Sequence, residues 1–206
     1  MLPNHEMASR EVQDALLAQL KQPFDPKFLK WRIGATNKDK TKGIALAYID
    51  AREVMKRLDD VCGVAGWQNN MREVPDGFVC DLTLFVGGQW VNKSNGAGRT
   101  QVEPVKGGMS DALKRSASVW GVGRYLYYLP TIWVAIKPAG RSFVLAEIPE
   151  LPNWALPNTD IRDWQLIAEQ EFDAKNSVGM DGENDADAPV IPNQTTMDDI
   201  IKANKK

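Results

Sequence analysis

The stretch KGGMSDALKRSASVWGVGRYLYYLP, from Lys106 to Pro130, decides the fold because it combines small residues with an adjacent pair of cations. Ser110 is a good N-cap residue, and Asp111 would lie in the first turn, where a carboxylate is favourable. The sequence therefore predicts a helix over residues 110–128.

The two sides of this predicted helix differ in chemistry. At about 100° per residue, one side carries Lys114, Arg115, Ser118, Val122 and Tyr125. The opposite side carries Leu113, Ala117 and Trp120. The small residues Ala112, Ser116 and Ala117 would let the helix lie close to a sheet. We therefore expect one buried side and one cationic strip that bears a hydroxyl group.

The cationic strip suits backbone phosphates. Arginine offers a fork of donors, lysine a point charge and serine a neutral donor. Lys106, expected just before the helix, adds a further cation. Arg124 falls on the apolar side, where it would pair with a carboxylate or extend its charged end into water.

The residues before this helix form a predicted antiparallel meander. Strands are expected over 66–74 and 78–86, joined by the turn PDG, and the second strand alternates Phe78, Cys80, Leu82, Leu84 and Val86 on one face. The pair GG turns the chain into a strand over 89–94. The stretch NGAG is expected to break or bulge that strand, which residues 99–105 would continue. The predicted class is α+β, with a β-meander packed on a helix in a β-β-β-α core.

Further elements surround this core. An amphipathic helix is expected over 9–24, with Val12, Leu16 and Leu20 on one stripe. A second is expected over 50–63, where Asp50 and Glu53 form a capping box and Gly63 ends the helix. Strands are expected over 27–33, 44–48 and 131–137, separated at 34–43 by an exposed loop, and a peripheral helix over 159–175.

Charge divides the chain into two parts. The net charge is −2, but residues 1–150 hold 20 Lys and Arg against 16 Asp and Glu, whereas residues 151–206 hold 5 against 11. Local charge decides polyanion binding more than the total does. From about residue 177 the chain is acidic and almost free of aromatic residues, which is typical of disorder. We therefore predict a nucleic-acid-binding domain over 1–176 and a disordered acidic tail over 177–206, with a short terminal helix.

Residue counts exclude several classes of enzyme. His5 is the only histidine, so Ser-His-Asp and Cys-His nucleophile systems are absent, and two cysteines with one histidine do not make a zinc cage. The stretch GVGRYL lacks the third glycine of a dinucleotide loop, and no phosphate-binding ATP loop exists. We predict no cofactor, no metal and no catalytic residue.

Location follows from similar observations. No apolar run is long enough for a membrane helix, and the first residues lack a signal-peptide pattern. Cys62 and Cys80 occupy apolar positions, which favours buried free thiols over a disulfide; a thiol nucleophile is the alternative. We predict a cytoplasmic protein.

Two alternatives to nucleic-acid binding stay open at this point. A Mg²⁺-dependent nuclease would use carboxylates beside a lysine, with Asp76, Asp81, Glu103 and Lys106 as candidates. A structural oligomer would use none of the cations on DNA.

Three segments also resemble a known family. KGGMSDALKRSASVWGVGRYLYYLP looks like the signature of the Rad-fifty-two family in its phage single-strand annealing branch. AYIDAREVMKRLDDVCGVAGW is similar to an upstream motif of that family, and FVCDLTLFVGGQWVNKSNGAG to its hairpin region. The three motifs occur in the family's order, and the resemblance covers residues 28–135.

The resemblance implies a ring-forming homo-oligomer that holds single-stranded DNA in a positive groove. It also implies that complementary strands are annealed without ATP, in recombination and double-strand break repair. By position, Lys114 and Arg115 match the helix pair that binds phosphate, and Lys106 matches a cation just upstream. Ser118 replaces a further arginine of the eukaryotic pattern, and Arg52 lies near an upstream basic position.

Two further roles complete the expectation. The hairpin cations Lys93 and Arg99 are candidates for a second, outer contact with DNA. The acidic tail is a candidate docking arm for a single-strand-binding protein or an exonuclease, or a competitor of DNA for the cationic strip. If the chain is phage-encoded, it acts in the cytoplasm of a bacterial host.

Overall fold

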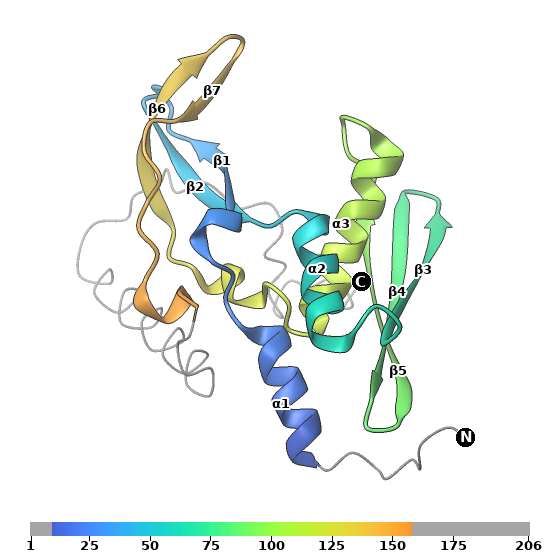
Figure 1. Ribbon diagram of the computed structural model, residues 1–206. Helices are drawn as coiled ribbons and strands as arrows, with labels where there is room; N and C mark the ends of the chain where they lie inside the picture. The colour runs from blue at the N-terminus through green and yellow to red at the C-terminus, as the bar shows by residue number, and fades with distance from the viewer. Residues whose placement is uncertain (1–9, 158–206) are drawn as a thin grey trace, which may run out of the picture.

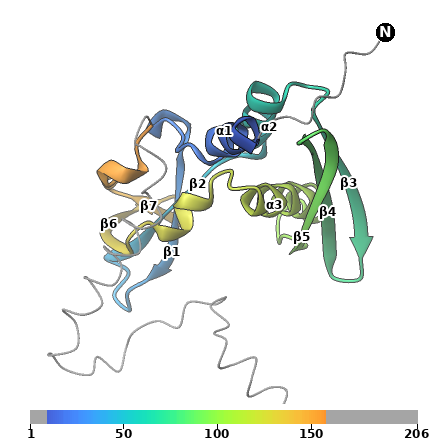
Figure 2. The same ribbon diagram turned by 90° about the horizontal axis from the view of Figure 1, so that it is seen from below.

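The computed structural model describes residues 10–157, which form two antiparallel sheets and three α-helices (Figure 1). One sheet has three strands in the order β3-β4-β5, and the other has four in the order β1-β2-β6-β7. Figure 2 shows α3 on the inner side of the three-stranded sheet, between the two sheets. The predicted α+β class, with a β-β-β-α core, is confirmed. The predicted helix over 159–175 and the tail over 177–206 lie outside the described residues.

The three-stranded sheet is a continuous meander. It consists of β3 (Trp67–Val74), β4 (Gly77–Val86) and β5 (Gln89–Gly98). The register of β3 with β4 is unbroken from Trp67↔Leu84 to Val74↔Gly77, and that of β4 with β5 from Gly77↔Gly98 to Val86↔Gln89. Gly87 and Gly88 both have positive φ, as a two-residue hairpin turn requires. The expected break at residues 95–98 is wrong, because β5 runs through them and ends at Gly98. The expected strand continuation over 99–105 is also wrong.

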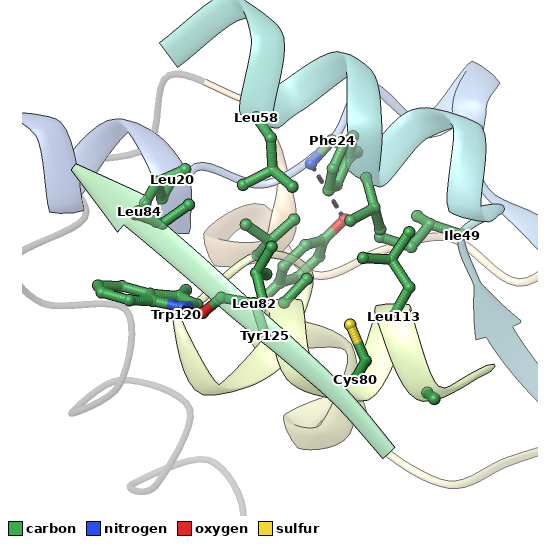
Figure 3. Close-up of a cluster of buried hydrophobic side chains, with 14 of the residues drawn as sticks. Leu20, Phe24, Ile49, Leu58, Cys80, Leu82, Leu84, Leu113, Trp120 and Tyr125 are labelled. Carbon is green, nitrogen blue, oxygen red and sulfur yellow. Dashed lines mark hydrogen bonds between the residues drawn. The ribbon is translucent and has the colours of Figure 1, made fainter. Parts of the chain in front are cut away.

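The core lies between the inner face of β4 and the helices (Figure 3). The face predicted for β4 is confirmed, with Phe78, Cys80, Leu82 and Leu84 all buried. Leu20 of α1 (Arg10–Lys21) and Leu58 of α2 (Ala51–Cys62) close the core from the other side. The hydroxyl of Tyr125 accepts a hydrogen bond from the Phe24 N–H at 3.1 Å, and burial raises the pKa of Tyr125 to about 12.

Two helix predictions need correction. Asp50 precedes α2 but makes no side-chain cap, because its carboxylate pairs with Lys30 instead. Val12 lies on α1 but is exposed, so only Leu16 and Leu20 of the predicted stripe reach the core. The end of α2 is as expected, since Gly63 follows it with a φ of +73°.

The four-stranded sheet joins two distant parts of the chain. It consists of β1 (Lys30–Thr36), β2 (Lys42–Tyr48), β6 (Ile132–Ala139) and β7 (Ser142–Leu145). Short 3₁₀ segments at Pro26–Phe28, Arg124–Tyr128 and Asn153–Ala155 lead into or follow these strands. Residues 27–29, predicted as strand, belong to the first segment and its end. The strands β1 and β7 approach each other although they are not neighbours in the hydrogen-bond order, so the sheet is curled.

Candidate nucleic-acid interface

The helix α3 (Pro104–Val119) begins before its predicted start. Proline at the first position needs no hydrogen-bond partner for its nitrogen, and Glu103 before it adopts a left-handed φ of +49°. Ser110 therefore lies inside the helix, and its predicted role as N-cap is wrong. A Cβ on Gly108 would lie 2.7 Å from the ring of Phe78, so glycine is needed for the helix to approach the sheet this closely.

Hydrogen bonds fix α3 on the sheet. The buried hydroxyl of Ser116 accepts from the Asn95 N–H at 3.0 Å and donates to the Cys80 carbonyl at 2.7 Å. The Trp120 indole N–H donates to the Leu82 carbonyl at 3.2 Å. Because these contacts join the helix to both β4 and β5, they determine which side of α3 faces outward.

The end of α3 is also earlier than predicted. The helix stops at Val119, and Gly121 and Gly123 have φ values of +102° and +68°. The chain therefore turns inward, and Val122 and Tyr125 are buried rather than aligned with the cationic strip. Arg124 caps the helix by donating to the carbonyls of Ser118 and Val119 at 2.7 and 2.5 Å, a position where a cation also opposes the helix dipole.

The exposed side of α3 carries the predicted cations. Arg115 is exposed, and its guanidinium forms no ion pair or hydrogen bond with another residue in 10–157. Lys114 is partly buried and pairs with Asp111 at 2.7 Å. Lys106 lies within the first turns of the helix and pairs with Glu103 at 2.9 Å. The hydroxyl of Ser118 donates to the Arg115 carbonyl at 2.7 Å. The side chain most open to an external anion is therefore that of Arg115.

Tyr48 connects α3 to the four-stranded sheet. The amine of Lys114 lies 5.9 Å from the centre of the Tyr48 ring, at the end of β2. Across the strand pair, Tyr48 is opposite Lys30, whose amine pairs with Asp50. The hydrogen bond from Lys30 to Asp50 raises the pKa of Lys30, so this amine stays charged. Arg52, the predicted upstream cation, is exposed on α2 and close enough to Lys30 to oppose its charge.

The four-stranded sheet presents a basic face that the sequence prediction did not include. Residues directly opposite in a ladder share a face, as do residues two apart on one strand. The face that carries Tyr48 therefore continues across all four strands. It includes the pairs Arg32↔Leu46, Ile44↔Trp133, Lys42↔Ala135 and Lys137↔Val144. We define the basic sheet face by its exposed members Arg32, Lys42, Leu46, Trp133 and Lys137.

A signal for this face existed in the sequence. Exposed residues alternate with half-buried ones along β1, so that Arg32 lies on the outer side and Ile33 on the other. Period-two alternation in KWRIGAT would have placed Arg32 outward. What the sequence did not show was that β6, with Trp133 and Lys137, pairs with β2.

The two predicted hairpin cations lie in different environments. Lys93 is opposite Leu82 and so faces α3, where its amine lies 4.2 Å from the centre of the Trp120 ring and 3.5 Å from the Val119 carbonyl. Burial, with the charges of Arg124 and Lys21, lowers the pKa of Lys93. Arg99 follows β5, donates to the Glu73 carboxylate and covers the Phe78 ring. Both side chains are engaged within the protein.

The carboxylates proposed for a nuclease are also engaged or dispersed. Asp81 accepts from Arg72 at 2.7 Å and from Ser94 at 2.6 Å on the outer face of the three-stranded sheet. Glu103 pairs with Lys106, and Asp76 lies in the β3–β4 turn. In the range 10–157, no three Asp, Glu, His or Cys side chains are grouped so that they could hold a metal ion.

The cysteines are free thiols. Cys80 is buried, as predicted, and Cys62 is half-buried. Burial raises the pKa of both thiols, so both are protonated at neutral pH. No described helix is long and apolar enough to cross a membrane.

The fold and the site together define a class: an α+β protein whose helix and adjacent sheet expose cations suited to a polyanion. Comparison with known proteins gives the family. The chain belongs to the Rad52/22 family of double-strand break repair proteins, whose model matches residues 12–83 and 76–141.

Two relatives extend this comparison. The chain is 39% identical over 142 residues to the single-stranded DNA-binding protein DdrA of Deinococcus deserti, which covers 68% of this chain and 69% of that protein. It is 36% identical over 142 residues to the protein of the same name from Deinococcus radiodurans, covering 68% and 67%.

Proposed function

We propose that the protein binds single-stranded DNA and anneals complementary strands without ATP, in recombination and double-strand break repair. The observation that carries this proposal is the position of Arg115 and Lys114 on the outward side of α3, with Tyr48 joining them to the basic sheet face. The membership of the family and the names of the two DdrA relatives support it.

Backbone phosphates are bound by cations from two elements. Arg115 offers a free guanidinium on α3, and Arg32 offers another on β1. Lys114 reaches a phosphate by exchanging its contact with Asp111, and Lys106 by exchanging its contact with Glu103. Arg52 and Ser118 complete the set on this side of the molecule. Because phosphate contacts carry no sequence information, binding is indifferent to base sequence.

Annealing requires no catalytic residue. The protein holds the backbone, and base pairing with a second strand supplies the specificity. Lys93 and Arg99 contribute an outer contact only after leaving Trp120 and Glu73, so we expect them to matter less than Arg115. The phage-type branch of the family is part of this proposal and rests on the three sequence motifs.

Assembly into a closed homo-oligomeric ring is also proposed. The strands β3 and β5 are edge strands of the three-stranded sheet, and unpaired edges favour association. Light scattering at micromolar concentration tests this part, and a monomer mass with and without DNA would contradict it. The tail over 177–206 remains a proposed docking arm for a single-strand-binding protein or exonuclease.

The decisive experiment measures annealing of complementary oligonucleotides without nucleotide and without metal. We expect the wild-type chain to accelerate annealing and Arg115→Ala to reduce it. Arg72→Ala removes the same charge from the outer face of the three-stranded sheet, where Arg72 is paired with Asp81; it is the matched control and should have little effect. Wild-type protein that fails to retain single strands at low salt would refute the proposal. Cleavage of labelled DNA after Mg²⁺ is added would favour the nuclease alternative.

A further inference from the structure

The basic sheet face contains an aromatic side chain that phosphate binding does not use. Trp133 lies on β6, directly opposite Ile44 of β2, and 39% of its surface is exposed. The same face carries the exposed cations Arg32, Lys42 and Lys137. An indole exposed among cations is the combination that binds an unpaired base beside its phosphates.

The composition of the four strands favours the same kind of ligand. The strands β1, β2, β6 and β7 contain no aspartate or glutamate. The charged groups of Arg32, Lys42 and Lys137 form no ion pair or hydrogen bond with another residue in 10–157, whereas Lys30, next to this face, pairs with Asp50. The surface around Trp133 is therefore both apolar and positively charged, without a carboxylate on these strands to repel a phosphate.

Trp133 lies on the same face that leads to the proposed phosphate contacts on α3. Along β2, the residues on this face run from Tyr48 through Leu46 and Ile44 to Lys42, a span of about 20 Å at roughly 3.3 Å per residue. Tyr48 at one end lies beside Lys114 of α3, and Trp133 is level with Ile44. A strand bound at α3 reaches Trp133 by following this face.

We propose that Trp133 stacks on an unpaired base of the bound strand, while Arg32 and Lys137 hold phosphates on either side. This inference rests on the proposed single-strand binding and adds a base contact to it. Stacking is tolerant of sequence, because every base has a flat π-face. The contact therefore orients a base without reading its identity.

The test uses the full chain and two probes of equal length: an oligothymidylate and an abasic strand with the same phosphates. Trp133→Ala should weaken oligothymidylate binding by about 5- to 150-fold, the range measured for loss of one base–aromatic stack. The same variant should bind the abasic strand as the wild type does. Trp133→Phe should restore most of the lost affinity.

Two controls make the result specific. Trp90→Ala removes an exposed indole from the three-stranded sheet, where Trp90 contacts Phe85 edge to face, and should leave both affinities unchanged. Arg115→Ala should weaken both probes equally, because it removes a phosphate contact. The chain has seven tryptophans, so fluorescence quenching by DNA is assigned to Trp133 from the difference between wild type and Trp133→Phe.

Each outcome decides the proposal. An equal loss on both probes, or no loss on either, refutes stacking while leaving single-strand binding intact. A changed particle mass for Trp133→Ala shows that the indole contacts a second copy of the chain instead, and also refutes it. Wild-type protein that binds neither probe refutes the proposed function itself.

Discussion

The two sheets of this protein differ in how much of their surface they bury. The inner face of the three-stranded sheet is covered by α3, and its strand β4 alone contributes Phe78, Cys80, Leu82 and Leu84 to the core. The four-stranded sheet buries only three hydrophobic side chains, those of Ile44, Ala45 and Val134, and it leaves Leu46 and Trp133 exposed among cations. The first sheet therefore contributes most to the core, whereas the second leaves the basic sheet face exposed to solvent.

The largest effect should come from the core of the first sheet. Leu82→Ala removes a fully buried side chain and should lower the free energy of unfolding by about 2–5 kcal/mol. Leu46→Ala, in the second sheet, should lower it by about 1 kcal/mol or less, because that side chain is partly in water already. Urea unfolding measures both. Similar losses for the two variants would show that the sheets share stability equally.

The next effect concerns the close approach of α3. Gly108→Ala places a methyl group 2.7 Å from the Phe78 ring and 3.2 Å from the Gly98 carbonyl oxygen. Overpacking of this kind costs about 1–3 kcal/mol, partly offset by the helix propensity of alanine. Thermal unfolding should show a lower Tm for this variant than for Lys106→Ala on the same helix. A Tm above that of wild type would mean that the helix can move away from the sheet freely.

The third prediction compares how two exposed arginines, one on each sheet, affect the binding of single-stranded DNA. Arg32→Ala should weaken single-stranded DNA binding and reduce the slope of log affinity against log salt by about 0.7, as expected for one lost phosphate contact. Arg72→Ala, on the outer face of the three-stranded sheet, should leave the slope unchanged, because Arg72 is paired with Asp81. Equal changes in slope for both variants would place DNA on both sheets.

The smallest effect is a pH dependence of the first sheet. The guanidinium of Arg72, and then the hydroxyl of Ser94, hold the pKa of Asp81 well below its usual range. A lowered folded-state pKa stabilises the protein above the unfolded-state value of about 3.9, and this contribution is lost as the pH falls below it. Between about pH 4 and pH 2, Asp81→Asn should therefore lose stability less steeply than wild type. Parallel curves in acid titrations followed by circular dichroism would contradict this.

The three-stranded sheet was predictable from the sequence, because its three strands follow one another directly along the chain. Alternation from Phe78 to Leu84 fixed the buried face of β4, and Gly87–Gly88 fixed the turn. The ends of α3 were not predictable by the same rules. The prediction placed Pro104 in a strand and started the helix at Ser110, whereas the structure starts the helix at Pro104 and uses Gly108 to approach Phe78.

The second sheet was only half predictable. Strands were predicted over 27–33, 44–48 and 131–137, which overlap β1, β2 and β6, and β7 was not predicted. The pairing of β2 with β6 joins segments on either side of the whole meander and α3. Local pattern carries no information about such a long-range contact. For this reason the sequence could place Lys114 and Arg115 together on one side of a helix, whereas the shared face of Arg32, Trp133 and Lys137 is visible only in the folded protein.

The absence of acidic residues from the four strands has a consequence for the kinetics of encounter. The chain as a whole carries a net charge of −2, so a polyanion at long range is weakly repelled. Near the four-stranded sheet the strands carry cations and no carboxylate, so the local charge is positive and favours the approach of a strand from this side. Added salt should therefore slow association more than it hastens dissociation, because it screens this attraction before contact is made.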